Sequence, residues 1–257
     1  MMRRVIFALF FLCAAAAPGR AERLVVSLSN HRVAVTSNFV GEDLVLFGTI
    51  EPEPGKMLAR SNYDLVVTVS GPPETLRTRR KQRVLGIWVN AESREFVHVP
   101  AYLAILSNRP VSEIASPAVL RRLQVGLDNF LLTQRIGPDI ADTVSNDPFR
   151  RAFVRLKEEQ YLYSQSPHAV TFLTPTVFRA AIPLPANAPT GTYAVDVKLF
   201  SQGEMLARAK TALDVIKAGF EQYVAEAARD HGLVYGIATA AMALAIGWLA
   251  SVVFRRD

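Results

Sequence analysis

The sequence is almost free of cysteine, since Cys13 is the only one among 257 residues. Cys13 lies in an apolar run near the amino terminus, which we expect to be removed as a secretory signal. The remaining chain would then contain no thiol. Disulfide bonds, a thiol nucleophile and a cysteine-ligated metal are therefore excluded for the mature protein.

Patterns typical of catalysis and of metal binding are also lacking. The sequence contains no serine nucleophile elbow, no phosphate-binding glycine loop and no dinucleotide fingerprint. Its histidines are scattered, with no pair four residues apart and no flanking carboxylate pattern of metal ligands: His31, His98, His168 and His231. We therefore expect no metal and no cofactor, and we predict that the protein is not an enzyme.

A strong charge of one sign is absent from most of the chain, although the formal net charge is +6. Arg3, Arg4 and Arg20 contribute three of these charges, and the last three residues contribute a net +1. The part between them carries only +2. A nearly neutral domain gives no reason to expect nucleic acid as a partner.

A targeting signal is present at the amino end. Arg3 and Arg4 precede an apolar run of 13 residues, 5–17, which is too short to cross a bilayer. Small residues at positions 19 and 21 place the cleavage site after Ala21, so residues 1–21 are predicted to be a signal peptide. Cleavage after position 17 is the alternative, and it is disfavoured because a proline would adjoin the scissile bond.

A second apolar run, 233–254, contains 22 residues without a charge. As a helix it would be roughly 33 Å long, enough to cross a hydrocarbon core of about 30 Å. Arg255 and Arg256 follow this run, and the positive-inside rule predicts a cytoplasmic tail of residues 255–257. With the signal peptide, this span predicts a single-pass protein of a bacterial inner membrane, with its amino-terminal domain in the periplasm.

Small residues recur at steps of three and four along the predicted transmembrane helix: Gly236, Ala240, Ala243, Gly247 and Ser251. Such a face permits close approach of a second helix, from a partner membrane protein or from a second copy of this chain. The alternative is that an alanine-rich span produces the stripe by chance. No charge lies within the span, so we expect it to carry no ion or proton.

Short apolar or alternating runs, separated by glycine, proline and serine, dominate the exported part. They predict a mainly β fold, namely an antiparallel immunoglobulin-like sandwich. Residues 22–110 form its first part and residues 166–216 its closing strands. Residues 111–165 are predicted to be a helical insertion, and residues 217–232 a juxtamembrane helix that leads into the transmembrane helix.

The helical insertion has one well-defined helix start. Asp147 is expected to cap a helix that begins at Pro148. The helical period then predicts one buried face and one exposed, charged face. The buried face is expected to hold Phe149, Phe153 and Leu156, and the exposed face Arg150, Arg151, Arg155, Lys157, Glu158 and Glu159.

A dense basic cluster lies in the first part of the β domain and leads into a tryptophan: Arg77, Arg79, Arg80, Lys81, Arg83 and Trp88. Cations beside an aromatic ring could bind a small oxyanion or the headgroups of anionic lipids. The alternative is a charged hairpin or edge strand whose cations discourage strand pairing, with Trp88 in the core.

Several segments together resemble an alphaproteobacterial family of transmembrane proteins that have a signal sequence, a periplasmic domain and one carboxy-terminal span. The segments that carry this resemblance are 39–48, 63–64, 71–72, 80–81, 86–90, 178–180, 184–193, 217–221, 247–248 and 254–256. The resemblance covers nearly the whole mature chain and brings no catalytic or binding residues with it. It implies an accessory role, since some members are expected to be encoded near permeases of the sulfite or sulfonate exporter type.

These observations predict a non-enzymatic accessory or interaction protein. The span, embedded in the lipid bilayer, would dock on a membrane partner such as a transporter, or pair with a second copy of the chain. The alternative function is a periplasmic binder or sensor of a small oxyanion or an anionic lipid headgroup, through the basic cluster from Arg77 to Arg83.

Overall fold

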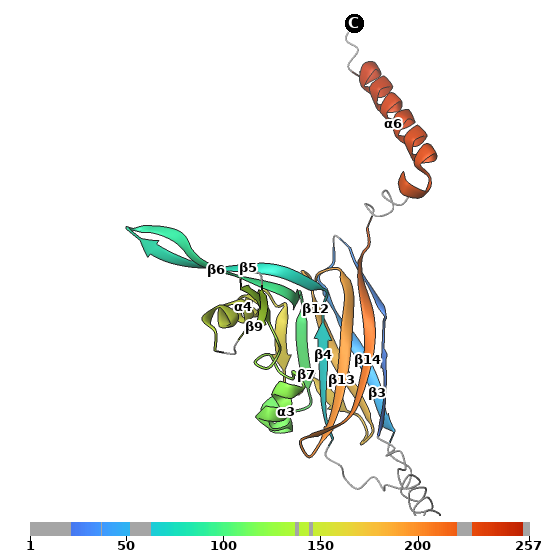
Figure 1. Cartoon of the computed structure of the whole chain (residues 1–257). Helices are drawn as coiled ribbons and strands as arrows, with labels where there is room; N and C mark the ends of the chain where they lie inside the picture. The colour runs from blue at the N-terminus through green and yellow to red at the C-terminus, as the bar shows by residue number, and fades with distance from the viewer. Residues whose placement is uncertain are drawn as a thin grey trace, which may run out of the picture.

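The computed structural model describes residues 22–36, 38–51, 63–136, 139–143, 146–219 and 228–253. Most of them form β-strands, and one long apolar helix lies near the carboxy terminus (Figure 1). A mainly β fold with a carboxy-terminal apolar helix is therefore confirmed. The predicted signal peptide, residues 220–227 of the predicted juxtamembrane helix and the cytoplasmic tail lie outside the described residues.

The first sheet has four strands in the order β1-β3-β12-β11, and every neighbouring pair is antiparallel. Its buried side chains alternate strictly with exposed ones along β12, as expected when one face covers a core. The strands are β1 (Arg23–Leu28), β3 (Gly41–Glu51), β11 (Val170–Phe172) and β12 (Val177–Pro185).

The second sheet has six strands in the order β10-β7-β4-β13-β14-β2. The inner strands pair antiparallel, as predicted, whereas the two outer pairs, β10 with β7 and β14 with β2, are parallel, so this sheet is mixed. The strands are β2 (Arg32–Val35), β4 (Tyr63–Ser70), β7 (Leu103–Ser107), β10 (Tyr163–Ser166), β13 (Gly191–Ser201) and β14 (Glu204–Lys217).

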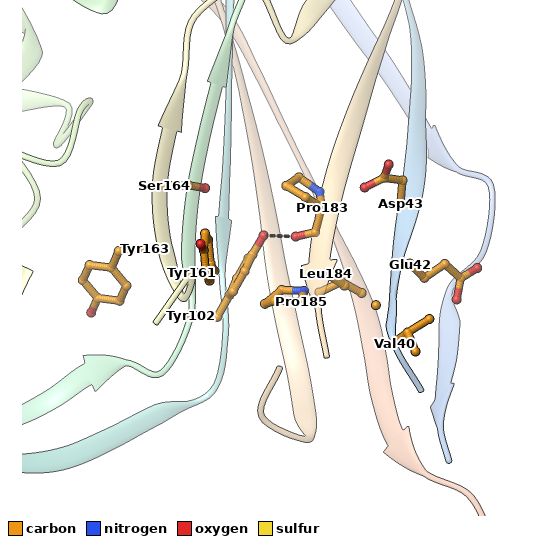
Figure 2. Close-up of a pocket in the computed structure, with 11 residues that line it drawn as sticks. Val40, Glu42, Asp43, Tyr102, Tyr161, Tyr163, Ser164, Pro183, Leu184 and Pro185 are labelled. Carbon is orange, nitrogen blue, oxygen red and sulfur yellow. Dashed lines mark hydrogen bonds between the residues drawn. The ribbon is translucent and has the colours of Figure 1, made fainter. Parts of the chain in front are cut away.

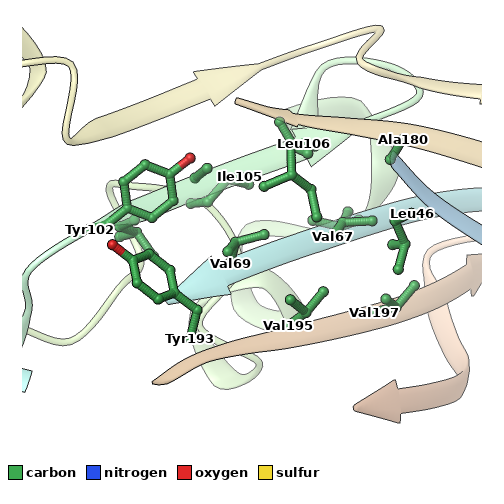
Figure 3. Packing of buried hydrophobic residues seen from close by; sticks show 14 of the residues in the cluster. Leu46, Val67, Val69, Tyr102, Ile105, Leu106, Ala180, Tyr193, Val195 and Val197 are labelled. Carbon is green, nitrogen blue, oxygen red and sulfur yellow. The ribbon is translucent and has the colours of Figure 1, made fainter. Parts of the chain in front are cut away.

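The core lies between these two sheets (Figure 3). Tyr102 connects them directly, because its hydroxyl donates a hydrogen bond to the carbonyl of Pro183 on β12. Its ring lies 5.5 Å from the ring of Tyr193 on β13. The Tyr193 hydroxyl donates to the carbonyl of Pro189 at 2.6 Å, the arrangement known as a tyrosine corner in immunoglobulin-type sandwiches.

The third sheet, β5-β6-β8-β9, extends away from the sandwich (Figure 1). Its long strands β5 (Pro73–Val84) and β6 (Ile87–Pro100) form a hairpin, which we call the arm. Two short strands, β8 (Thr133–Ile136) and β9 (Asp139–Asp142), add to the base of the arm. The predicted insertion at 111–165 is therefore mixed, since it also contains β8, β9 and most of β10.

Three helices accompany these strands: α2 (Val111–Ile114), α3 (Pro117–Arg122) and α4 (Pro148–Glu159). The predicted cap of α4 is confirmed, since the Asp147 carboxylate accepts hydrogen bonds from the backbone N–H groups of Phe149 and Arg150. The predicted faces of α4 are partly wrong. Leu156 is 44% exposed, whereas Arg150 and Lys157 are buried.

Both buried cations of α4 are satisfied by specific acceptors, which the helical period alone does not reveal. The Arg150 guanidinium donates to three backbone carbonyls of the segment that precedes β8, those of Leu127, Asp128 and Phe130, at 2.9, 3.1 and 2.9 Å. Burial lowers the pKa of Arg150, although Asp128 and Tyr163 act in the opposite direction. Hydrogen bonding thus lets a charged side chain occupy a core position.

Helix α6 (Gly232–Val253) covers the predicted transmembrane segment apart from its last residue, which lies outside the described residues. It is long and apolar enough to cross a membrane, and none of its apolar stretch from Gly232 to Ser251 is buried against the rest of the protein. An apolar helix that no described part of the chain buries is the form expected of a membrane span.

Candidate functional site: the β5–β6 arm

The arm is a two-stranded ribbon whose pairing runs from Pro73 opposite Pro100 to Val84 opposite Ile87. Leu85 and Gly86 form the turn, and both have positive φ angles, 49° and 87°. Two-residue hairpin turns that match the twist of their strands need this backbone conformation. Glycine adopts it freely, whereas leucine does so at a cost, so the position of Leu85 is not explained by turn propensity.

The tip of the arm is apolar and exposed. Leu85 is 98% exposed and Trp88 66% exposed, and Val84, Ile87 and Val89 are exposed as well. The alternative in which Trp88 belongs to the core is therefore wrong. A contiguous set of exposed apolar side chains is uncommon on the surface of a soluble protein and typically marks an interaction site.

The predicted basic cluster lies along the stem of the arm, next to this tip. Arg77 pairs with Glu95 at 3.6 Å, and Arg80 pairs with Glu92 at 3.7 Å. Among the described residues, Arg79, Lys81 and Arg83 have no carboxylate partner. The cluster therefore combines neutralised cations with cations that lack a carboxylate partner, and none of them lines the pocket of about 440 Å³ or the cleft of about 370 Å³ in the described part of the chain.

The base of the arm is firmly packed against α4. The rings of Phe96 on β6 and Phe153 on α4 lie 4.7 Å apart between centroids. Arg94 lies over the ring of Phe149 at 5.2 Å and donates to the side-chain oxygen of Gln134 on β8 at 2.9 Å. The outer part of the hairpin, residues 79–93, is exposed throughout.

The arm leaves the domain at the end that continues into α6. The end of β4 at Ser70 pairs with Ala194, and the start of β13 at Gly191 pairs with Val215, close to the end of β14. A Cβ atom built on Gly191 would lie 3.0 Å from the side chain of Pro72, just before β5. The root of the arm and the last strand before the apolar helix thus share one end of the sandwich.

The small residues of α6 are exposed along one side of the helix, as their spacing predicts: Gly236, Ala240, Ala243, Gly247 and Ser251. Apart from the neighbouring residues and the backbone of the helix itself, no atom of the described chain lies within 4 Å of a Cβ built on either glycine. The face is therefore open to a second helix, and nothing in the described chain covers it.

A pocket of about 440 Å³ lies at the same end of the sandwich as the root of the arm (Figure 2). Three tyrosines, Tyr102, Tyr161 and Tyr163, line it together with Glu42 and Asp43. Burial raises the pKa of Tyr102 and of Tyr163 well above the ordinary value. Their phenols therefore stay protonated and serve as hydrogen-bond donors, to the carbonyls of Pro183 and Pro100.

The histidines and acidic residues of the described ranges do not assemble into a group of three or more that could hold a metal ion. The sequence did not indicate the pocket, because its residues come from four separate segments of the chain, 40–43, 102, 161–164 and 183–185. Only the topology brings them together.

Comparison with protein families gives one match, which covers residues 23–256. The family is described as "Putative transmembrane protein (Alph_Pro_TM)". A comparison with curated proteins finds no match.

Proposed function

Because the chain belongs to this family of transmembrane proteins, we propose that it is a non-enzymatic accessory protein of the bacterial inner membrane. Helix α6 anchors it, and the β domain faces the periplasm after removal of the signal peptide. The arm docks on a partner in the same membrane, such as a transporter. The observation that carries this proposal is the exposed apolar tip of the arm.

The free energy of burying apolar side chains favours a complex in which a partner covers the tip. Complete burial of one Leu, Ile or Val side chain stabilises a complex by about 1.5–3 kcal/mol. Leu85, Ile87 and Trp88 are 98%, 68% and 66% exposed, so most of their apolar surface is not buried in the fold. The tip can therefore supply a compact anchor of the kind that dominates binding at protein interfaces.

The location of the arm favours a partner in the membrane. The arm and the last strand before α6 share one end of the sandwich, and β5 alone is roughly 40 Å long at the usual rise per residue. A ribbon of that length extends well beyond the domain. The small-residue face of α6, which includes Ala243, offers a second contact to the same partner or to a second copy of the chain.

The test places a photoreactive residue at Leu85 in the full-length protein and crosslinks it in native membranes. A matched control carries the same residue at Leu173, which is 53% exposed and lies at the opposite end of the sandwich. The proposal expects one membrane protein to be captured from Leu85 and again from Ala243, but not from Leu173. It expects Trp88→Ala to abolish the capture from Leu85, and equal capture from Leu85 and Leu173 overturns it.

A second candidate function is contact with anionic lipid, and the free cations of the stem favour it. Arg79, Lys81 and Arg83 lie next to the apolar tip without a carboxylate partner among the described residues. Cations beside a tryptophan suit the membrane interface, where each Lys or Arg contributes about 1 kcal/mol near an anionic surface. The tip would then enter the headgroup region, with these cations on the phosphates.

Fluorescence of Trp88 tests this second function. The chain has two tryptophans, so Trp248→Phe leaves Trp88 as the only tryptophan in reconstituted full-length protein, and its emission is excited selectively over that of the tyrosines. Brominated phosphatidylglycerol should quench Trp88, whereas brominated phosphatidylcholine should not. Arg79→Gln with Lys81→Gln should reduce the quenching more than the control Arg77→Gln with Arg80→Gln, which removes the two paired cations. Absence of quenching in both lipids rejects lipid contact.

A further inference from the structure

A cleft of about 370 Å³ lies on the outer face of the second sheet. Its floor comes from three adjacent strands, because Thr68 of β4 pairs with Asp196 of β13, which pairs with Lys210 of β14. One row further along, Lys198 pairs with Arg208. The opposite wall is formed by Arg122, the last residue of α3, and by the segment that follows this helix.

Positive charge dominates the cleft. Four cations, Arg122, Lys198, Arg208 and Lys210, face a single carboxylate, that of Asp196, which leaves a net charge of +3. Asp196 binds two of the cations: Lys198 Nζ lies 2.5 Å from its Oδ2, and Arg208 Nε lies 2.7 Å from its Oδ1. Among the described residues, Arg122 and Lys210 have no carboxylate partner.

Two buried polar groups in the cleft have unused hydrogen-bonding capacity. The Thr68 side chain is 5% exposed, and its hydroxyl has no partner in the described part of the chain. Lys198 is also buried, and its ammonium makes one hydrogen bond although it carries three donors. Buried donors without acceptors are costly and rare in folded proteins, so both groups point to a ligand that accepts hydrogen bonds.

We propose that this cleft binds a small multivalent oxyanion of the phosphate or sulfate type. Asp196 holds Lys198 and Arg208 in place before the ligand arrives, and Lys210 and Arg122 supply the charge that Asp196 does not neutralise. Thr68 supplies a hydroxyl donor at the floor. The site is separate from the arm, and it holds whether or not the arm binds a protein or lipid.

The ion could be free in solution or belong to a lipid headgroup, because both present the same phosphate oxygens. The test uses the full-length protein in phosphatidylcholine nanodiscs, titrated calorimetrically with inorganic phosphate and with sulfate. Saturable binding of either ion is expected, with chloride giving no heat. No heat from either ion overturns the proposal.

Variants of the cleft residues test whether the measured heat comes from anion binding in the cleft. Lys210→Gln and Arg122→Gln should each weaken binding about tenfold or more, since each removes a charge-assisted contact. Arg179→Gln removes an exposed cation of β12 outside the cleft and should leave the affinity unchanged. An equal loss from all three variants would show that the ion responds only to net charge, and would overturn the assignment.

Thr68→Val is the variant that separates a ligand role from a structural one. It should weaken anion binding severalfold and yet preserve or raise the melting temperature in anion-free buffer, because it removes a buried hydroxyl without a partner. Unchanged affinity in this variant would exclude Thr68 from the site. A repeat in phosphatidylglycerol nanodiscs identifies the source: weaker apparent binding of inorganic phosphate assigns the site to headgroup phosphate, and unchanged binding assigns it to the free ion.

Discussion

Lys157 of α4 and Glu74 at the base of the arm form an ion pair across 83 residues of sequence, with Nζ 2.5 Å from Oε1. The lysine is buried and also donates to the carbonyl of Ala101 at 3.3 Å. Its ammonium lies about 6 Å from the rings of Phe153 and Tyr163. Helix α4 therefore holds the base of the arm, so that a tip far from the domain still has a defined direction.

The two halves of this ion pair should not be equally costly to remove. Glu74→Gln leaves the buried ammonium without its counter-charge, which costs about 3–5 kcal/mol for a buried pair. Lys157→Met keeps the packing of the long side chain, and Glu74, whose side chain is 33% exposed, can be hydrated. Urea unfolding of both variants should therefore show the larger loss for Glu74→Gln. A larger loss for Lys157→Met would contradict this account.

The tip of the arm should contribute little to folding stability, whereas the base of the arm should contribute strongly. Trp88 is 66% exposed at the tip, so Trp88→Ala should change the free energy of unfolding by less than about 0.5 kcal/mol. Phe96, on the same strand but fully buried against Phe153, should lose about 3–5 kcal/mol on replacement by alanine. Thermal unfolding measures both changes. A large loss for Trp88→Ala would mean that the tip packs against part of this chain and is not a docking surface.

The sequence predicted those elements whose determinants are local. The apolar run before Arg255 specifies α6, and the carboxylate of Asp147 ahead of Pro148 specifies the start of α4. Alternating apolar residues in β12 specify a strand with one buried face. Each of these signals lies within about 20 consecutive residues.

The features that the sequence did not predict depend on contacts between segments that are distant in the chain. Arg150 and Lys157 read as surface residues because their acceptors, the carbonyl of Leu127 and the carboxylate of Glu74, lie far away in sequence. The basic cluster was recognised, but its arrangement along a projecting ribbon follows from the pairing of β5 with β6. Lys198 gave no signal at all, since an alternating strand does not reveal whether its polar face is covered.

Gly48 on β3 should tolerate no side chain. A Cβ at this position would lie 2.2 Å from the ring of Phe178, which is fully buried on the neighbouring strand β12. Gly48→Ala should therefore destabilise the sandwich by about 1–3 kcal/mol, since the ring has no free space to enter. The double variant with Phe178→Leu should recover part of this loss relative to Phe178→Leu alone, as a double-mutant cycle would measure. Simple additivity would show that the steric conflict is absent.

Asp196 should make the β domain sensitive to acid. Burial alone would raise the pKa of this carboxyl, but hydrogen bonds from Arg208 and Lys198 outweigh it and hold the pKa below the ordinary value. A folded-state pKa below the unfolded value of about 3.9 stabilises the protein above that pH. This stabilisation is lost as the pH falls from about 4 through the lower folded-state value, because protonation then breaks both ion pairs.

Arg208→Met tests this linkage, because it removes one of the two partners and keeps the length of the side chain. The pKa of Asp196, followed by carboxyl carbon NMR, should rise in this variant, and the loss of stability between about pH 4 and pH 2 should become shallower. Arg155→Met removes a cation from an exposed pair with Glu159 at 3.6 Å, so it serves as the control. Such an exposed pair contributes little to stability, so its removal should leave the loss of stability at low pH unchanged. If the Arg208 variant lost stability between about pH 4 and pH 2 in the same way as the parent protein, the cations of the cleft would not determine the pKa of Asp196.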